Sequence, residues 1–447
     1  MLLHLLRRQR LSRPRLTRAS LALLACSAIG STLAWTAVHI RLESSVPEAG
    51  EVLATAPERF ELRFSDPVNE ALSSLVLVTP QGDSVLVVLG TPGDDDRILV
   101  GDVPGLAVGE YLVLWRTVSA DGHPVSGEFG FTFASTTTEA DAAAVEADGG
   151  IPPLVEAESA GIAAPPSETG PPAGVVLLAG LGMVCLLGFA GLLWYCGSLP
   201  LLREPRIGRA AQALGWAALL LLAGDLIGWV VGVVPPGAGL AGIAAAIGSN
   251  TGVVGLGRIA LISLALLLLR RRGRAAAALA LTAVLIGAAS GHSVAISPWI
   301  TMPANAIHLG SVSIWLGGLL LLVLAPDGPT DESHAWKFID IARAVSATAL
   351  LAVILILASG MVQSARFVGD LAAFTGTGYG RGVLLKSTGL AVLVGFGAWH
   401  RFRIMPDLER EAARHGLRRT VRLETIVMLA VVVVAAWLAR VSPPVGQ

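Results

Sequence analysis

Short runs in residues 39–134 alternate apolar and polar side chains. In the run 58–65, Phe60, Leu62 and Phe64 share one face, and charged or polar residues occupy the other. A period of two is typical of a strand with one buried face. The same alternation recurs in residues 110–116 and 128–133, and turn clusters rich in Gly, Pro and Asp separate the runs. Several short strands in about 95 residues predict a small all-β sandwich or barrel.

From residue 173 onward, the pattern changes to long apolar segments. A helix needs about 20 residues to cross a bilayer, and eight segments are of this length. They lie near residues 174–197, 209–233, 251–270, 274–296, 303–325, 338–363, 382–404 and 420–440. We therefore expect an all-α polytopic membrane bundle of about eight helices.

The remaining parts of the chain read as a leader and a linker. Residues 1–38 hold a basic stretch, an apolar run and then the small residues Ala34 and Ala37, as a secretory signal peptide does. The alternatives are an uncleaved anchor or a lipoprotein signal at Cys26. Residues rich in Ala, Pro, Glu and Asp then predict a flexible acidic linker. The predicted divisions are 1–38 signal, 39–134 β-domain, 135–172 linker and 173–447 membrane domain.

The arginines suggest an orientation for the eight segments. If the β-domain is exported, alternate loops face the cytoplasm, where positive charge should concentrate. Those loops carry Arg203, Arg206, Arg209, Arg270, Arg271, Arg272, Arg274, Lys337, Arg343, Arg401, Arg403, Arg410, Arg414, Arg418, Arg419 and Arg422. The opposite loops hold little more than Arg366 and Arg381. We expect a multi-pass protein of the cytoplasmic membrane with an extracytoplasmic N-terminal domain.

Composition narrows the chemistry. Only 15% of residues are charged and the mean hydropathy is +0.68, which fits a chain largely in lipid. The net charge of −1 gives no support for a nucleic-acid partner. No cysteine lies between His39 and Pro172, so the β-domain has neither a disulfide nor a thiolate metal site. The sequence contains no CxxCH motif, which excludes covalently attached c-type haem.

Two histidines are the candidate ligands of the β-domain. His39 follows the predicted cleavage site, and His123 lies in the turn Ser119-Ala120-Asp121-Gly122-His123-Pro124. Such a turn brings the Asp121 and His123 side chains close together. Imidazole nitrogens with a carboxylate oxygen suit Cu(II) among common divalent ions. Taken alone, the turn is also compatible with a purely structural role.

Three stretches resemble the CopC copper-resistance proteins: His39 to Gly50, Phe60 to Val68, and Tyr111 to Gly127, which contains Ser-Ala-Asp-Gly-His-Pro. The resemblance implies an immunoglobulin-like or cupredoxin-like barrel that binds Cu(II) through His39, Asp121 and His123. Cleavage after Ala37 would place Val38 before His39. Residues 39–134 contain no methionine, so we expect one Cu(II) site without a second, Met-rich site.

The membrane half is similar to the CopD family. The matching runs are Gly291-His292-Ser293, His308 to Leu319 with its Trp-Leu-Gly-Gly, and Tyr379 to Lys386. The resemblance implies copper transport. His292 and His308 both lie some 6–8 Å inside the expected outer boundary, at about 1.5 Å per residue. With Met302 or Met361 they could bind Cu(I), or they could instead form hydrogen bonds between helices.

The function expected from these features is extracytoplasmic Cu(II) binding coupled to copper transport, in the import direction, in copper homeostasis or resistance. No P-loop motif is present, and we expect no enzyme activity. The expected partners are copper ions, the lipid bilayer and an extracytoplasmic copper donor or reductase. The alternatives are a membrane-anchored copper-binding or sensing module, and a histidine-ligated haem electron carrier.

Overall fold

The computed structural model describes residues 40–91, 95–119, 122–134, 173–198, 204–325, 332–441 and 443. The β-domain and the helical domain belong to one compact unit of the chain. The expected signal peptide and acidic linker lie outside the described residues, as do His39 and Asp121.

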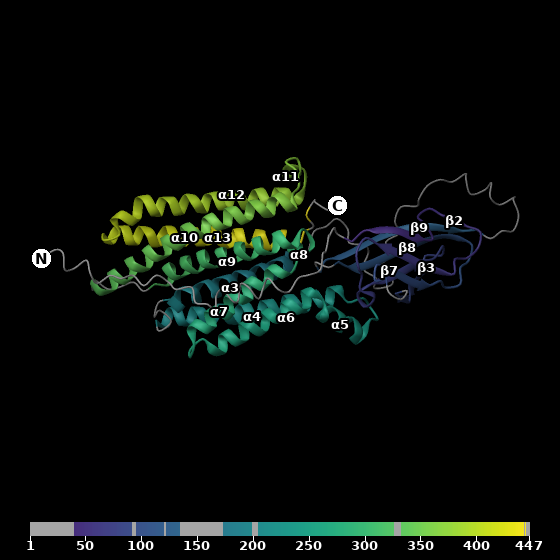
Figure 1. Ribbon diagram of the computed structural model, residues 1–447, viewed down its shortest axis with the longest axis horizontal. Helices are drawn as coiled ribbons and strands as arrows, with labels where there is room; N and C mark the ends of the chain where they lie inside the picture. Colours follow the sequence, from purple (N-terminus) through teal and green to yellow (C-terminus); the bar gives the residue numbers. More distant parts are fainter. Residues whose placement is uncertain are drawn as a thin grey trace. The chain divides into compact units, whose positions relative to one another are not determined.

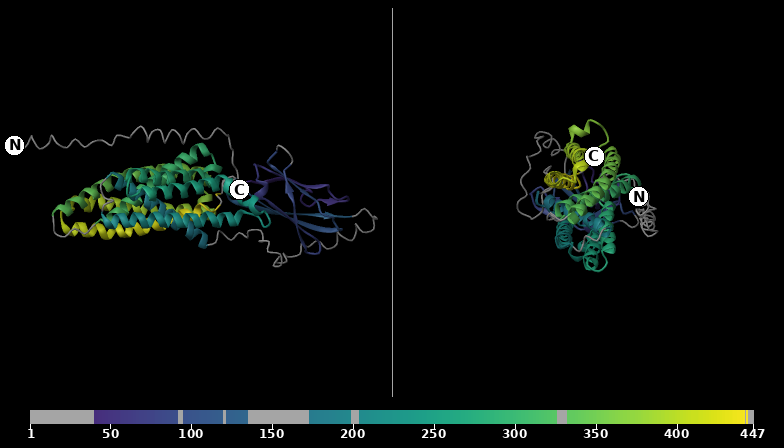
Figure 2. Two further views of the ribbon diagram at one scale, coloured as in Figure 1. Left: turned by 90° about the horizontal axis from the view of Figure 1, so that it is seen from below. Right: turned by 90° about the vertical axis from the view of Figure 1, so that its left-hand side faces the viewer.

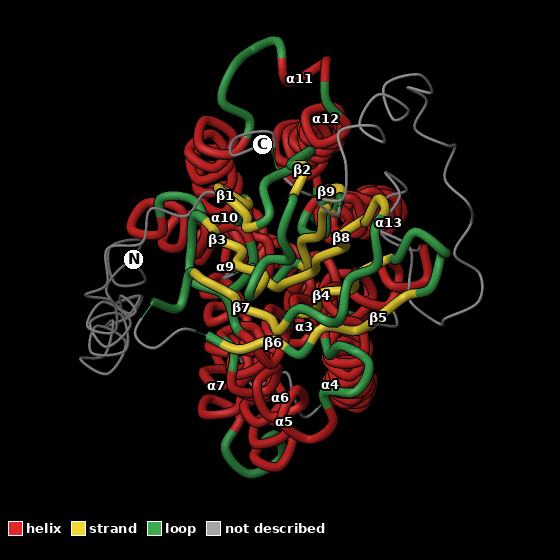
Figure 3. The backbone as a smooth tube through the Cα atoms, turned by 90° about the vertical axis from the view of Figure 1, so that its right-hand side faces the viewer, coloured by secondary structure: helices red, strands yellow, loops and turns green. Residues whose placement is uncertain are grey.

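The N-terminal domain is a sandwich of two β-sheets, as predicted. One sheet has the order β1-β3-β7-β6 and the other β2-β9-β8-β4-β5 (Figure 3). All pairs are antiparallel except β2 with β9. The strands are β1 (Leu42–Val46), β2 (Val52–Leu53), β3 (Arg59–Phe64), β4 (Ser74–Val78), β5 (Ser84–Val87), β6 (Leu89–Gly90), β7 (Ile98–Asp102), β8 (Gly109–Val118) and β9 (Pro124–Phe133), and a 3-10 turn η1 (Glu70–Leu72) precedes β4.

The alternating residues of β3 form the centre of the sandwich. Phe60, Leu62 and Phe64 are fully buried, as the period of two predicts. Phe64 meets the Trp115 ring of β8 edge-on, with ring centroids 5.3 Å apart. These contacts tie one sheet to the other and hold the β8–β9 hairpin in place.

The C-terminal domain is a bundle of helices lying side by side (Figures 1 and 2). Its α-helices are α3 (Ala173–Ser198), α4 (Pro205–Val233), α5 (Gly239–Gly248), α6 (Asn250–Leu268), α7 (Gly273–Leu285), α8 (His292–Ala295), α9 (Pro298–Leu324), α10 (Glu332–Phe367), α11 (Ala373–Gly376), α12 (Gly378–Trp399) and α13 (Glu411–Leu438). The 3-10 segments η3 (Ile286–Ala289) and η5 (Met405–Asp407) and the π-helical η4 (His400–Ile404) complete it.

Seven helices of the described chain are long and apolar enough to cross a membrane. The fourth expected segment, 274–296, is shorter than predicted, because α7 passes into η3 and the helix ends before Gly291, which has a φ of +66°. Together α7 and η3 span roughly 27 Å, close to the thickness of a bilayer core. The pattern of eight apolar segments is therefore recovered as seven full helices and one short one.

Helices α3 and α9 approach each other closely at two glycines. A side chain at Gly191 would collide with the carbonyl oxygen of Ser313, and one at Gly317 would collide with the backbone of Gly191. Small residues allow this kind of backbone contact between membrane helices. The contact fixes α9, which carries His308, against the most buried helix of the bundle.

Candidate metal centre

The β8–β9 hairpin ends in the turn that carries His123. The backbone N–H of Ser119 donates to the His123 carbonyl at 2.9 Å, and that of Gly122 donates to the Ser119 carbonyl at 2.9 Å. Gly122 has a φ of +85°, which favours glycine at this position. The turn therefore holds His123 in a fixed place directly before β9.

At the start of the β-domain, Ile40 follows His39 and is buried in the sandwich core.

The turn that carries His123 packs against the helical domain. The Trp229 indole N–H of α4 donates to the Gly122 carbonyl at 2.8 Å. The nearest atoms to a side chain added at Gly122 belong to Thr251 of α6, so glycine is needed for the close approach. Nearby, Arg116 of β8 donates to the carbonyl of Gly232 at 2.5 Å, and burial lowers the pKa of Arg116.

An apolar cluster accompanies these polar contacts. Leu72 and Val118 of the β-domain are buried together with Val233 of α4 and Ala246 of α5. Burial of apolar surface stabilises such a contact but does not select one orientation. The hydrogen bonds of Trp229 and Arg116 fix how the two domains are oriented. The hairpin turn is thus docked in a defined position on the ends of α4, α5 and α6.

In this position His123 stacks on His292, the first residue of α8. The two rings are 4.9 Å apart at their centroids and 12° from parallel. His292 is 7% exposed and its Nε2 lies 3.0 Å from the carbonyl oxygen of Val441. Phe367 and Tyr379 both meet its ring edge-on, with centroids 6.3 Å away. The sequence predicts each histidine as a ligand, but the pairing of these two was not foreseen.

The hydrogen bond to Val441 defines the chemistry of His292. A carbonyl oxygen only accepts, so Nε2 must carry the proton, and in the neutral ring the lone pair is on Nδ1. A metal ion binds an imidazole through the lone pair, and the hydrogen bond on the other nitrogen fixes the ring's orientation. The contact with Val441 therefore fixes the orientation of the His292 ring and makes Nδ1 its acceptor nitrogen.

His308 lies on α9 and has a similar arrangement. Its Nδ1 is 3.1 Å from the hydroxyl oxygen of Ser359, and that hydroxyl donates to the Leu355 carbonyl at 2.6 Å. Because the single Ser359 proton is used, Nδ1 of His308 donates and the lone pair is on Nε2. His308 is 6% exposed and its neighbours come from α10, including Gly360. Met361, the suggested thioether ligand, is 72% exposed.

The described residues include no cluster of three or more His, Cys, Asp or Glu side chains that could hold a metal ion. The expected β-domain set has two members, His39 and Asp121, outside those residues, so its geometry stays a prediction. What the structure brings together is one predicted ligand of each domain, His123 and His292.

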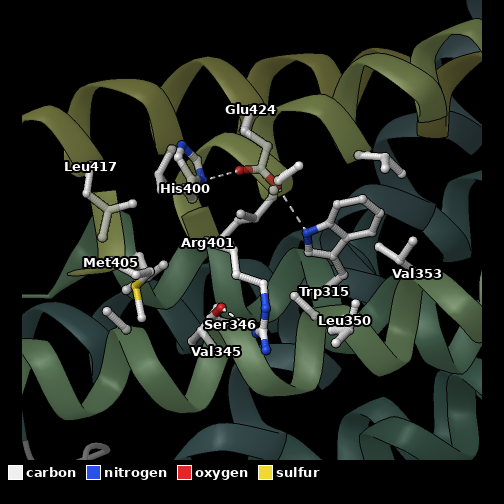
Figure 4. Close-up of a pocket in the computed structure, with 18 of the residues that line it drawn as sticks. Trp315, Val345, Ser346, Leu350, Val353, His400, Arg401, Met405, Leu417 and Glu424 are labelled. Atoms are coloured by element: carbon white, nitrogen blue, oxygen red, sulfur yellow. Dashed lines mark hydrogen bonds and ion pairs between the residues drawn. The ribbon is translucent and has the colours of Figure 1, made fainter. Parts of the chain in front are cut away.

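The resemblance to the CopD family also includes Glu424 in the C-terminal helix, but its burial and its partners were not predicted. Glu424, 2% exposed, contacts Trp315 of α9 and His400 of η4 (Figure 4). A single carboxylate followed by fourteen uncharged residues in the last apolar helix was the available signal.

A β-sandwich joined to a polytopic helical bundle, with predicted copper ligands where they meet, defines a class of membrane-bound copper proteins. Two family models match the chain: the CopC domain over residues 42–134 and Copper resistance protein D over residues 340–438. The chain belongs to the CopC/CopD copper-resistance family, with both domains in one polypeptide.

Individual relatives agree with these domains. The chain is 28% identical over 434 residues to Copper transport protein CutJ of Bacillus subtilis (strain 168), covering 91% of this chain and 75% of that protein. It is 33% identical over 103 residues to Copper resistance protein C of Escherichia coli, covering 21% of this chain and 80% of that protein. The crystal structure of CopC from Methylosinus trichosporium OB3b aligns at 35% identity and a TM-score of 0.22, covering 22% of this chain and 98% of that one.

Proposed function

We propose that this protein binds Cu(II) in its β-domain and moves copper into the cell through its helical bundle. The ligands of the β-domain are His39, Asp121 and His123. The names of the relatives, a copper transport protein and a copper resistance protein, support copper as the cargo. His292 and His308 are the copper-binding groups of the bundle.

The observation that carries this proposal is the stacking of His123 on His292. One proposed ligand of the capture site lies against a buried imidazole of the bundle, whose ring is held in place by its contact with Val441. Copper bound by the first ring can pass to the second by exchange of one ligand, because the docked hairpin keeps both in reach. A separate membrane anchor would need no such contact.

The arginines support an extracytoplasmic position for this contact. The residues that touch His292 include Tyr379 at the start of α12 and Val441 just beyond the end of α13. Arg401 and Arg403 follow the end of α12, and the arginines of α13 lie in its first half. A 28-residue helix is about 40 Å long, so the basic residues are at the far side of the bilayer, the cytoplasmic one.

The test is copper uptake by cells that express the full chain or its His292→Ala variant. We expect the full chain to raise internal copper and the variant to lose most of the increase, because the transfer partner of His123 is gone. His415→Ala, an exposed histidine on α13, is the matched control and should behave as the unchanged chain.

Other results would favour the remaining functions. Equal internal copper with and without the chain, at matched expression, would contradict transport and leave an anchored copper-binding module. A Soret absorption band in the purified protein that disappears in His292→Ala or His308→Ala would favour the haem electron carrier.

A further inference from the structure

A carboxylate is buried near the middle of α13, directly after the arginines of this helix. Arg414, Arg418, Arg419 and Arg422 precede Glu424 on α13, and the residues from Thr425 to Leu438 carry no charge. Glu424 is thus the last ionisable group of this helix before its apolar half. Placing a carboxylate among apolar helices is costly, and such groups are usually partnered and functional.

Glu424 has one partner on each carboxylate oxygen. Its Oε1 accepts a hydrogen bond from the indole N–H of Trp315 at 3.1 Å. Its Oε2 lies 3.2 Å from Nδ1 of His400, at ion-pair distance but without the alignment of a hydrogen bond. Figure 4 shows the carboxylate between the two rings. Both Glu424 and His400 are buried.

The hydrogen bonds around His400 determine where its protons are. Nε2 of His400 is 2.7 Å from the hydroxyl oxygen of Thr420. That hydroxyl has one proton, and it is directed at the carbonyl oxygens of Gly416 and Leu417, both 3.0 Å away. Carbonyl oxygens only accept, so the Thr420 proton is used there and Nε2 of His400 must donate its own proton to Thr420.

This arrangement requires one more proton. With Nε2 protonated, a neutral His400 would leave its acceptor atom Nδ1 3.2 Å from an oxygen of an ionised Glu424, and two acceptors at that distance repel each other. Adding one proton removes the conflict, either as imidazolium with carboxylate or as imidazole with carboxylic acid. The pair therefore holds a single proton that either partner can carry.

A cavity adjoins this pair. It has a volume of about 280 Å³, is lined mostly by apolar side chains, and reaches the exposed residues Arg401 and Phe402. Arg401 donates to the hydroxyl of Ser346 at 3.4 Å. Of the described residues lining the cavity, those from α9, α10 and α12 are uncharged, and Arg401 is the charged group beside the pair. Helix α3, which also packs on α13, carries no charged residue.

The pair is also connected to the proposed copper path. Trp315 lies seven residues after His308 on α9, which is two turns on the same helix face, about 10 Å away. Copper at His308 would place a positive charge two helix turns from Trp315, whose indole N–H donates to Glu424. In a medium of low dielectric, the two positive charges repel, so copper binding favours release of the proton into the cavity.

From this geometry we propose that Glu424 and His400 form a proton-binding site whose proton is exchanged with the cytoplasm as copper crosses the bundle. The coupling rests on the transport function proposed above, whereas the site itself does not. One proton leaves as a hydrated ion when copper arrives and one is regained when copper departs, with no transfer of electrons.

The site is tested on the full chain in lipid vesicles by infrared difference spectroscopy during a pH titration. We expect a carboxylic C=O band that is lost in Glu424→Gln and shifted in His400→Gln. Glu411→Gln, an exposed carboxylate on the same helix, is the control and should retain the band. Spectra identical in the unchanged chain and in Glu424→Gln would overturn the site.

The coupling is tested in vesicles that contain a pH dye and an indicator for copper in the oxidation state that is added. Addition of copper should give both signals with the unchanged chain and with Glu411→Gln, and a proton signal at least tenfold smaller with Glu424→Gln. Copper entry without any proton signal in the unchanged chain would overturn the coupling. An unchanged chain that gives the infrared band but moves no copper would overturn the transport function while the proton site stands.

Discussion

His123→Ala should abolish high-affinity Cu(II) binding by the full chain. The predicted site has few side-chain ligands, and His123 supplies one of its two imidazoles. Loss of a residue that only supports a ligand typically costs 10–100-fold in metal affinity. Loss of the ligand itself should therefore weaken binding by at least about 100-fold. Titration of the purified protein with Cu(II), followed by paramagnetic resonance, measures the change directly.

The spectrum adds a check that affinity alone does not. A tetragonal Cu(II) site that loses a nitrogen ligand changes its hyperfine splitting even where some copper stays bound. His415→Ala, exposed on α13, should leave both affinity and spectrum unchanged. Unaltered binding by His123→Ala, with the β-domain still folded, would contradict the predicted ligand set.

The domain types followed from the hydrophobic pattern because each domain has one dominant periodicity. In β3 the alternation of Phe60, Leu62 and Phe64 decides which face is buried, so the strand could be predicted without its neighbours. The eight apolar segments were found for the same reason. The shorter α7 was not, since the chain changes to the 3-10 segment η3 after Leu285 while the sequence stays apolar.

The pairing of His123 with His292 could not be predicted in this way. The two residues are far apart in the sequence, and their contact depends on how the hairpin turn docks on α4 and α6. That docking is decided by Trp229 and by the space that Gly122 leaves for Thr251, features without any periodic signal. Matching depth in the membrane pointed to His292 with His308, whereas the contacts of His308 are with Ser359 and Gly360 of α10.

The contact between His400 of η4 and Glu424 of α13 could not be predicted for a second reason. The sequence places His400 at the end of an apolar segment, where an interfacial position is the simple expectation. The π-helical turn η4 places its ring toward α13, so that it meets Glu424 and Thr420. A local change of helix geometry of this kind alters which face a side chain occupies, and it is common at functional sites.

Gly191→Ala should strongly destabilise the bundle, although it adds a single methyl group. The new carbon would overlap the backbone carbonyl of Ser313, and backbone atoms cannot move aside as the end of a side chain can. Overpacking a well-packed interior typically costs 1–3 kcal/mol and occasionally more, so we expect a loss of about 3 kcal/mol in the free energy of unfolding. Denaturant unfolding of the full chain in detergent measures it.

Gly180→Ala on the same helix is the matched control, because its added carbon would lie no closer than 3.5 Å to its neighbours. That variant should unfold as the unchanged protein does, or slightly later, since alanine favours helix more than glycine. A wider spacing of α3 and α9 in Gly191→Ala would also displace His308 and Trp315, which both lie on α9. Copper uptake and the proton signal should therefore fall together in this variant. Stability equal to that of Gly180→Ala would show that the two backbones are not in contact at this position.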